Sequence, residues 1–242
     1  MKALILNSGL GSRMGALTKE HPKCMTSIQN IGTNQEETIL SRQLRLLAED
    51  GIKEIVMTTG KFDTVLMEYC ESLNLPCHIT YVKNPIYDQT NYIYSIYMAR
   101  AELQDDMILM HGDLVFTKEV LAEVIAGKDS CMTVSSTLPL PEKDFKAVID
   151  GEQIKKVGIE FFESAMAAQP LYKLLKKDWL VWLQNIETFC ENDNRKCYAE
   201  NAFNEVSDRC VIKALDVKDA LCCEIDTPED RERVIAQLEQ SY

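Results

Sequence analysis

The first 23 residues place a short apolar segment directly before a loop with two glycines and two basic side chains. Residues 2–6 are mostly apolar, which predicts a buried strand. Gly9 and Gly11 follow, and a glycine lets a ligand approach the backbone closely because it has no Cβ atom. Backbone N–H groups in such a loop can point at phosphate oxygens, and Arg13 and Lys23 add cations that bind anions. The segment therefore predicts a site for a phosphate-bearing ligand.

The spacing of the glycines excludes a dinucleotide-binding turn. That motif needs a third glycine three residues after the second one, where this chain has Met14. It also needs an acidic residue at the end of the second strand, and residues 54–59 end in two threonines.

The overall composition restricts the class of partner. The net charge of −12 disfavours nucleic acid, because nucleic-acid binding depends on neutralising phosphates with lysine and arginine. The nine cysteines are odd in number and form no C-x-x-C pair, so we expect free thiols in a reducing cytoplasm. Apolar runs are far shorter than the roughly 20 residues of a membrane span, and the N-terminus lacks a signal-peptide pattern. We therefore expect a cytoplasmic protein without membrane insertion.

Strands alternate with helices over residues 1–128, which predicts parallel βαβ units and an α/β fold. The expected strands are 2–6, 54–59, 78–82 and 107–110, and three of the expected helices are 62–73, 91–103 and 117–126. A further helix is expected to follow a capping box at Thr33 and Glu36 and to run through Ile39 and Leu47.

The pattern changes after Asp129. We expect strands at 130–137 and 145–159, a helix at 179–190, short strands at 211–215 and 222–225, and a last helix capped by Thr227. The chain is predicted to be one domain, residues 1–242. Its predicted parts are a nucleotide-binding core (1–128), an acceptor-binding insertion over the sheet (129–221), and a metal-site strand with a closing helix (222–242).

Two aspartates follow buried strands. Asp113 comes after residues 107–110, and Asp226 comes after residues 222–225. Open α/β sheets bind ligands at the carboxyl ends of their strands, and carboxylates there are suitable oxygen ligands for Mg²⁺. By itself, each aspartate is also typical of a turn or a helix cap. Glu224 lies two residues before Asp226 and would share its face of a strand.

Asn91 and Ser95 lie one turn apart on the helix predicted over 91–103, so both would face the same way. Their side chains could bind a base or a ribose. Capping of the helix by Asn91 explains that residue equally well.

These motifs together resemble the sugar-phosphate and choline-phosphate nucleotidyltransferases. Within this family the chain is most similar to bacterial CTP:phosphocholine cytidylyltransferases of the LicC type and to the domain that activates 2-aminoethylphosphonate. It departs at Asn7-Ser8, where many relatives have Ala-Ala or Ala-Gly, and at Ala16-Leu17, where many have Pro-Leu. The resemblance rests on Gly9-x-Gly11-x-Arg13, Pro22-Lys23, Lys83-Asn-Pro-x-Tyr87, Thr90-Asn91-x-x-x-Ser95, Gly112-Asp113 and Glu224-Ile-Asp226-Thr-Pro-Glu-Asp230.

The resemblance implies a Rossmann-like (GT-A-like) nucleotidyltransferase fold with a mixed, mostly parallel central sheet flanked by helices. It implies that Asp113 and Asp226 bind Mg²⁺ and that Lys23 bridges the attacking phosphate and the α-phosphate of CTP. The implied catalytic residues are Lys23, Arg13, Asp113 and Asp226. The implied nucleotide-binding residues are Asn7, Ser8, Gly9, Leu10, Gly11, Ser12, Arg13, Lys23, Asn91, Ser95 and Gly112.

The acceptor remains open between two chemistries. Aromatic side chains of residues 129–221 could bind a quaternary ammonium by cation–π attraction, which favours phosphocholine, although aromatic residues pack in cores more often. Asp144 could instead hold a primary amine and Lys146 a phosphonate, which favours 2-aminoethylphosphonate. Glu224 and Tyr198 complete the predicted acceptor site. The aromatic residues considered are Phe145, Phe161, Phe162, Tyr172, Trp179, Trp182 and Tyr198.

Other hypotheses are a sugar-1-phosphate nucleotidyltransferase and a non-catalytic nucleotide-binding regulator. The oligomeric state stays open, a homodimer included.

Overall fold

The computed structural model describes residues 1–9, 11–28 and 37–240. Among these residues, no helix has both the length and the apolar character that crossing a bilayer requires.

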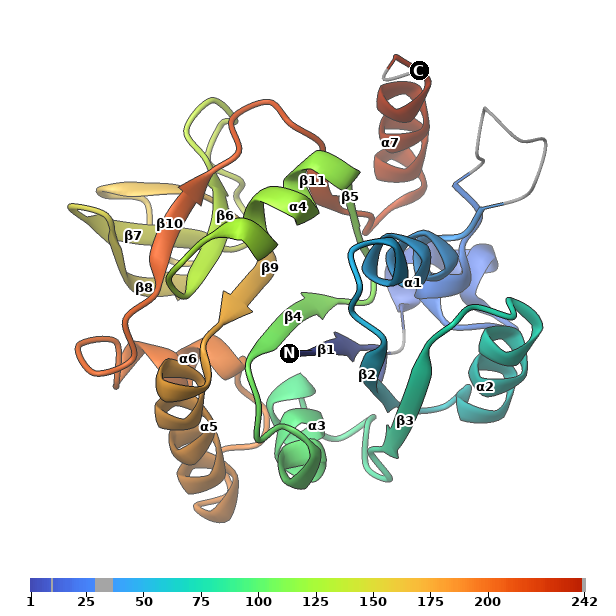
Figure 1. The fold of residues 1–242 in the computed structure, drawn as a ribbon, viewed down its shortest axis with the longest axis horizontal. Helices are drawn as coiled ribbons and strands as arrows, with labels where there is room; N and C mark the ends of the chain where they lie inside the picture. The colour runs from blue at the N-terminus through green and yellow to red at the C-terminus, as the bar shows by residue number, and fades with distance from the viewer. Residues whose placement is uncertain (10, 29–36, 241–242) are drawn as a thin grey trace.

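Within the described residues, nine strands form one central sheet, in the order β3-β2-β1-β4-β9-β6-β10-β8-β7 (Figure 1). β3, β2, β1 and β4 are parallel, whereas β9 runs antiparallel to both β4 and β6. The predicted mixed α/β fold is confirmed. The strands are β1 (Lys2–Leu6), β2 (Glu54–Thr59), β3 (His78–Lys83), β4 (Met107–His111), β6 (Cys131–Ser135), β7 (Lys146–Asp150), β8 (Gln153–Gly158), β9 (Ala165–Leu174) and β10 (Lys213–Asp216).

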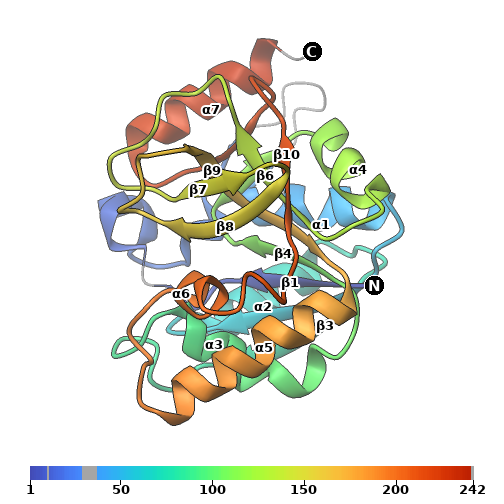
Figure 2. The same cartoon turned by 90° about the vertical axis from the view of Figure 1, so that its left-hand side faces the viewer.

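Alternate residues of β1 face two different layers of helices. Ala3 and Ile5 pack in one core cluster, and Leu4 and Leu6 pack in another, because successive side chains of a strand point to opposite faces. Figure 2 shows α1 and α4 on one side of the sheet and α3, α5 and α6 on the other. The first cluster includes residues of α1 (Ile39–Glu49), α2 (Asp63–Ser72) and α4 (Lys118–Ala126); the second includes residues of α3 (Tyr92–Ala99), α5 (Lys176–Glu191) and α6 (Ala199–Asn204).

The order of the strands reverses beside β1. The chain passes from β1 to β2 and β3 on one side, and it later returns to the other side of β1 as β4. The carboxyl ends of β1 and β4 therefore meet at a topological switch point, where open α/β sheets bind ligands.

A two-stranded sheet of β5 (Leu114–Phe116) and β11 (Cys222–Glu224) lies next to this point. Glu224 pairs with Leu114, and the N–H of Ile225 donates to the carbonyl of Asp113 at 3.0 Å. Helix α7 (Pro228–Gln240) covers the pair, and its buried Val234 packs in the same core cluster as Ile225. This packing brings the end of the chain to the carboxyl end of β4.

The elements expected over residues 1–128 are confirmed within a few residues of their predicted ends. Thr33 and Glu36, the predicted capping box, lie outside the described residues. Helix α1 begins at Ile39, and Thr38 with Ser41 forms its capping box. Three short 3-10 helices, η1 (Ser12–Thr18), η2 (Lys23–Met25) and η3 (Arg100–Glu102), were not predicted and lie within the described part of the chain.

The sequence also gave no indication of β9, although it is a ten-residue strand. Pro170 interrupts its pattern, and a proline is normally excluded from a central strand because it lacks the N–H donor. Here the β6–β9 register shifts opposite this segment, and the hydroxyl of Thr133 donates to the carbonyl of Gln169 at 2.9 Å. Since β9 lies between β4 and β6, the expectation that residues 129–221 lie over the sheet is wrong. Their role in acceptor binding stays a prediction.

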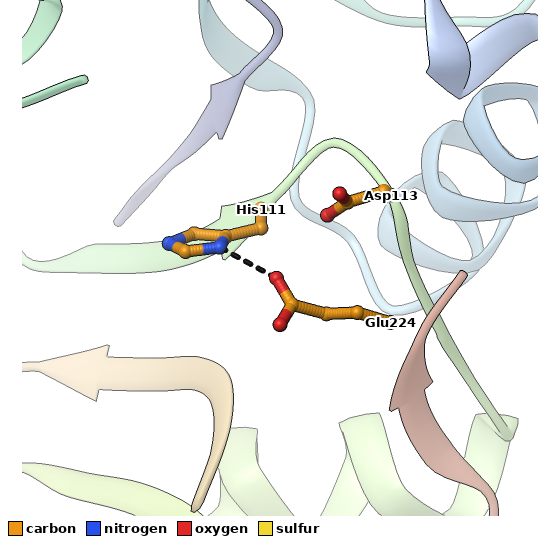
Figure 3. Close-up of side chains that lie close together, drawn as sticks. All are labelled: His111, Asp113 and Glu224. Atoms are coloured by element: carbon orange, nitrogen blue, oxygen red, sulfur yellow. Dashed lines mark hydrogen bonds and ion pairs between the residues drawn. The ribbon is translucent and has the colours of Figure 1, made fainter. Parts of the chain in front are cut away.

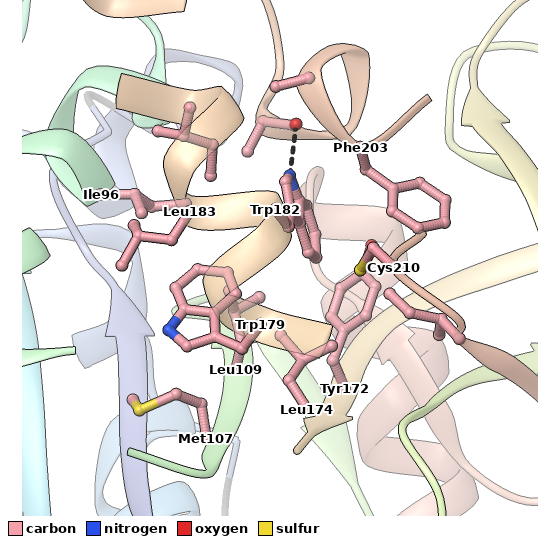
Figure 4. Packing of buried hydrophobic residues seen from close by; sticks show 14 of the residues in the cluster. Ile96, Met107, Leu109, Tyr172, Leu174, Trp179, Trp182, Leu183, Phe203 and Cys210 are labelled. Carbon is pink, nitrogen blue, oxygen red and sulfur yellow. Dashed lines mark hydrogen bonds between the residues drawn. The ribbon is translucent and has the colours of Figure 1, made fainter. Parts of the chain in front are cut away.

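Trp179 and Trp182 belong to the core, in line with the general tendency of aromatic residues to pack there. Both side chains are fully buried, and Figure 4 shows Trp182 among Trp179, Tyr172 and Phe203. The indole N–H of Trp182 donates to the carbonyl of Ala199 at 2.9 Å and so links α5 to α6.

We predict that Trp182→Ala lowers the free energy of unfolding by about 3–5 kcal/mol, because it leaves a cavity in a closely packed cluster. Urea denaturation followed by circular dichroism measures this. Phe162, whose side chain is 51% exposed, is the matched control, and Phe162→Ala should cost about 1 kcal/mol or less. A loss below 1 kcal/mol for Trp182→Ala would contradict the prediction.

Candidate active site

The loop after β1 forms one wall of a pocket of about 280 Å³. Gly11 has a φ of 62°, in the left-handed region that favours glycine, and 3-10 helix η1 (Ser12–Thr18) follows it. The hydroxyl of Thr18 donates to the carbonyl of Gly11 at 2.9 Å and closes the loop. The pocket is lined by Leu6, Asn7, Gly9, Gly11, Arg13, Pro22, Lys23, Cys24, Gly112 and Asp113.

Two glycines of this pocket serve different purposes. A Cβ atom on Gly112 would lie 1.6 Å from Oδ1 of Asn7 and 2.8 Å from the carbonyl of Leu6, so the turn after β4 needs a glycine to pack on the loop. A Cβ atom on Gly9 would meet no protein atom within 4 Å. Gly9 lines the pocket, and a side chain at this position would meet open space and not the protein.

Three of the four predicted catalytic side chains, Arg13, Lys23 and Asp113, line this pocket, and the fourth, Asp226, contacts two of them. The ammonium of Lys23 contacts carboxylate oxygens of both Asp113 and Asp226. A guanidinium nitrogen of Arg13 lies 2.9 Å from Oδ1 of Asp226. Two carboxylates and two cations thus form one charged cluster.

Charge pairing outweighs burial in this cluster. Burial opposes the charge of Lys23, but Asp113 and Asp226 raise the pKa of Lys23 above its ordinary value. Burial likewise opposes the charge of Asp113, but Lys23 and His111 lower the pKa of Asp113. Lys23 and Asp113 are therefore both ionised at neutral pH.

Hydrogen bonds outside the cluster hold the two aspartates in position. The amide of Gln43, a buried residue of α1, donates to the carbonyls of His111 and Leu114 at 2.9 and 2.7 Å, so it spans the turn that carries Asp113. The carboxylate of Asp230 accepts from the backbone N–H groups of Asp226 and Thr227 at 3.2 and 2.9 Å. The predicted cap is confirmed, since the hydroxyl of Thr227 accepts from the N–H of Asp230.

The cluster also contains residues that could hold a metal ion. Ligand atoms of His111, Asp113 and Glu224 lie within 4.8 Å of one another (Figure 3). His111 is already engaged, because its Nδ1 lies 2.7 Å from Oε1 of Glu224 and this partner raises the pKa of His111 to about 9 against the effect of burial. Burial and the nearby Asp113 raise the pKa of Glu224 to about 7. Asp113 and Asp226, which converge on the single ammonium of Lys23, offer the oxygen ligands that Mg²⁺ prefers.

Asn91 and Ser95, two of the predicted nucleotide-binding residues, have different surroundings. The side chain of Asn91 caps α3 by accepting from the N–H of Tyr92 at 2.7 Å, and it also lines a second pocket. Ser95 is buried, and its hydroxyl contacts the hydroxyl of Ser8 at 2.7 Å and accepts from the amide of Asn84 at 3.0 Å. Ser95 therefore supports, through Ser8, the loop after β1 that was predicted to bind phosphate, which we call the phosphate loop. Leu10 and the side chain of Ser12 lie outside what the structure describes.

The second pocket, of about 200 Å³, adjoins the charged cluster on the side of α3 and α6. We call it the aromatic pocket. The ring centroids of Tyr92 and His111 are 4.8 Å apart, and those of Phe145 and Tyr198 are 4.9 Å apart. Its lining is Arg13, Asn91, Tyr92, His111, Asp113, Lys143, Asp144, Phe145, Ile159, Tyr198, Glu224 and Asp226.

Three of the four predicted acceptor residues, Asp144, Tyr198 and Glu224, line the aromatic pocket. Burial and the charge of Asp226 raise the pKa of Asp144. Lys146 is the exception. It is buried, and its ammonium donates to the carbonyls of Pro141 and Asp144, so it holds the loop that carries Asp144.

Sequence reasoning missed Gln43 and Tyr92. Gln43 stands on the buried face of an amphipathic helix, where nothing in the pattern separates it from a structural residue. Tyr92 directly follows Asn91 at the start of α3, and an aromatic residue at that position was the available signal.

Several known proteins are similar to this chain in sequence or in fold. Residues 3–142 match the family model of the MobA-like NTP transferase domain. The chain is 27% identical over 248 residues to a CMP-5'-(3-aminopropyl)phosphonate synthase of Streptomyces rubellomurinus, covering 96% of this chain and 38% of that protein. It is 29% identical over 140 residues to a CTP:phosphoglutamine cytidylyltransferase of Campylobacter jejuni, covering 55% and 52%. The chain thus spans about half the length, or less, of these curated relatives.

Two solved structures have the same fold. The inositol-1-phosphate CTP transferase from T. maritima superimposes with a TM-score of 0.77 at 21% identity, covering 99% of this chain and 96% of that one. The CTP:phosphocholine cytidylyltransferase LicC from Streptococcus pneumoniae gives a TM-score of 0.76 at 17% identity, covering 98% of both chains. The predicted Rossmann-like nucleotidyltransferase fold and the resemblance to this group are confirmed.

We predict that Gly9→Ala and Gly112→Ala separate ligand binding from folding. Gly9→Ala should keep the melting temperature within about 2 °C of the unchanged protein and weaken CTP binding at least about tenfold, because its methyl group meets only the space for the ligand. Gly112→Ala should lower the melting temperature by several degrees, since the added carbon overlaps the protein itself. Differential scanning fluorimetry and calorimetric titration with CTP measure both effects. Unchanged CTP affinity in Gly9→Ala would show that the loop after β1 does not take part in CTP binding.

Proposed function

The chain belongs to the MobA-like NTP transferase domain family of nucleotidyltransferases, and on that basis we propose that it transfers CMP from CTP to a small zwitterionic phosphate or phosphonate. Phosphocholine is the favoured acceptor, which gives CDP-choline and pyrophosphate. The observation that carries the proposal is the placement of Lys23, Asp113, Asp226 and Arg13 between the phosphate loop and the aromatic pocket.

The reaction joins two anions, so it needs cations between them. A phosphate oxygen of the acceptor attacks the α-phosphorus of CTP in line, a new P–O bond forms, and the bond from the α-phosphorus to the bridging oxygen breaks. Pyrophosphate leaves with that electron pair. Such transfers are catalysed mainly by positioning and by charge stabilisation. Arg13 and Lys23 line the pocket of the loop, where each can offset phosphate charge.

A divalent ion would add further positive charge to this site. Asp113 and Asp226 would hold Mg²⁺, which supplies positive charge to the phosphates when it is bound. Lys23, which lies between the two carboxylates here, would then turn its ammonium toward the phosphates. The role of the protein is to keep these groups within reach of one another through the turns after β4 and β11.

The choice of CTP is supported by relatives. The four proteins compared above carry CTP or CMP in their names, and two of them share sequence with this chain over more than half of its length. The transfer of this property to the present chain is part of the proposal.

The aromatic pocket supports a cationic acceptor. Rings of Tyr92, Phe145 and Tyr198 lie beside the carboxylates of Asp144 and Glu224, and aromatic faces with nearby negative charge suit a quaternary ammonium. An aminophosphonate is the second candidate. It is favoured by the aminopropylphosphonate relative and by Asp144, whose carboxylate could accept hydrogen bonds from a primary amine. The burial of Lys146 removes the phosphonate contact expected for it.

We predict that Lys23→Met, Asp113→Asn and Asp226→Asn each lower the rate of pyrophosphate release by roughly 10²–10³-fold or more, because each removes charge where the reaction needs it. A coupled pyrophosphate assay with CTP and phosphocholine measures the rate. The exposed Lys19 and Asp219 provide matched controls, and Lys19→Met and Asp219→Asn should keep nearly full activity. Near-normal turnover in Asp113→Asn or Asp226→Asn would reject the metal assignment.

We also predict that CTP is preferred over UTP, dTTP and GTP, and that phosphocholine and 2-aminoethylphosphonate are turned over faster than glucose 1-phosphate. A pyrophosphate-release screen of these four nucleotides against the three acceptors and phosphoethanolamine tests this. Preference for the hexose phosphate would identify a sugar nucleotidyltransferase. CTP binding without pyrophosphate release from any pair would indicate a non-catalytic nucleotide-binding protein.

A further inference from the structure

A buried carboxylate lies directly behind the aromatic pocket. Glu200, in the first turn of α6, is 1% exposed. One of its oxygens accepts a hydrogen bond from the hydroxyl of Tyr92, and the other accepts from the hydroxyl of Tyr172 at 2.9 Å. Burial and the adjacent Glu200 raise the pKa of both tyrosines well above the ordinary value, so both phenols keep their protons and donate.

The two tyrosines face different parts of the molecule. Tyr92 lines the aromatic pocket, where its ring meets His111 and lies 5.9 Å from Tyr198. Tyr172 is buried in the core, and its ring packs against Trp182 at 5.6 Å. Glu200 therefore ties a pocket wall to the rigid core of the protein.

Glu200 forms no ion pair with a lysine, arginine or histidine among residues 1–9, 11–28 and 37–240, and its hydrogen-bond partners are neutral. The ammonium of Lys23 contacts Asp113 and Asp226, Arg13 also contacts Asp226, and His111 pairs with Glu224. The two hydrogen bonds that Glu200 accepts come from phenols, which carry no charge, and the charge of Glu200 also contributes to the raised pKa of His111. A buried charge acts on its surroundings with little screening by solvent.

We propose that Glu200 is a specificity-determining positioning residue: it fixes the Tyr92 ring in the pocket wall and supplies the negative charge by which the pocket selects a cationic group. This inference rests on the proposed function, because it treats the aromatic pocket as the site of the acceptor. The ring of Tyr92 can attract a cation by a cation–π interaction. Because the Tyr92 hydroxyl donates a hydrogen bond to a carboxylate, the ring becomes more electron-rich, and this strengthens the attraction. A neutral ligand of the same shape gains nothing from the charge.

Binding of choline and of its uncharged isostere 3,3-dimethyl-1-butanol tests the charge directly. Titration calorimetry on the whole protein gives both dissociation constants without requiring turnover. The unchanged protein should bind choline more tightly than the isostere. Glu200→Gln, which keeps the shape and removes the charge, should weaken choline binding about tenfold and change isostere binding less than about twofold.

Three further variants separate charge from structure. Tyr172→Phe removes one hydrogen bond to Glu200 but keeps the carboxylate and the pocket lining, so its preference for choline should change less than about threefold. Glu200→Asp keeps the charge and should retain more of the preference than Glu200→Gln. Glu205→Gln, an exposed position just after α6, should behave like the unchanged protein.

Several results would overturn the inference. The first is equal affinity of the unchanged protein for choline and the isostere. The second is a Glu200→Gln protein that still prefers choline as strongly as the unchanged protein does. The third is an equal loss of choline preference in Glu200→Gln and Tyr172→Phe. If Glu200→Gln does not fold, Tyr92→Phe serves as the test, because it removes the hydrogen bond between the Glu200 carboxylate and the Tyr92 ring. Tyr92→Phe should then reduce the preference for choline over the isostere. An unchanged preference in Tyr92→Phe would also overturn the inference.

A parallel transfer assay keeps this inference distinct from the proposed function. Choline binding that depends on Glu200, without transfer to phosphocholine, would reject cytidylyl transfer to that acceptor and leave the role of Glu200 in place. Equal kcat/KM for phosphocholine and 3,3-dimethylbutyl phosphate would reject the role of Glu200 and leave cytidylyl transfer in place.

Discussion

The contact of the Lys23 ammonium with the carboxylates of Asp113 and Asp226 joins three segments that are far apart in the chain. Two carboxylates held this close repel each other unless a cation lies between them, and a buried charge without its partner is strongly destabilising. The fold must therefore deliver all three groups to one place. It does so through the register of β1 with β4 and through the pairing of β5 with β11, which bring Asp113 and Asp226 to the loop that carries Lys23.

Polar side chains away from the charged cluster make this arrangement rigid. Gln43 spans the turn of Asp113, Asp230 holds the turn of Asp226, and Ser95 supports the phosphate loop through Ser8. Buried networks of this kind favour a single arrangement, because each group that loses its partner carries a desolvation cost. The charged cluster and the loop after β1 thus depend on contacts from α1, α3 and α7, which lie in different layers of the fold.

The aromatic pocket has a different physical basis. It is built from the core cluster of α3, α5 and α6, in which Trp182, Tyr172 and Phe203 pack together. Glu200 connects that cluster with the ring of Tyr92 in the pocket wall. Core packing and the wall of the aromatic pocket are therefore linked on this side, whereas paired charges govern the cluster of Lys23, Asp113 and Asp226.

The sequence by itself determined the features that depend on local pattern. The apolar strand before Gly9 and Gly11, the cations Arg13 and Lys23, and the positions of the first strands and helices were all predicted, since strand and helix periods and glycine loops are visible within a few residues. Only the tertiary structure decided how distant residues are used. It placed Trp179 and Trp182 in the core but Phe145 and Tyr198 in a pocket, turned Lys146 into a support for a loop, and set β9 with Pro170 inside the sheet at a register shift. The physical reason is that an aromatic ring or a buried charge has the same local pattern in either role, and the neighbour that covers it comes from elsewhere in the chain.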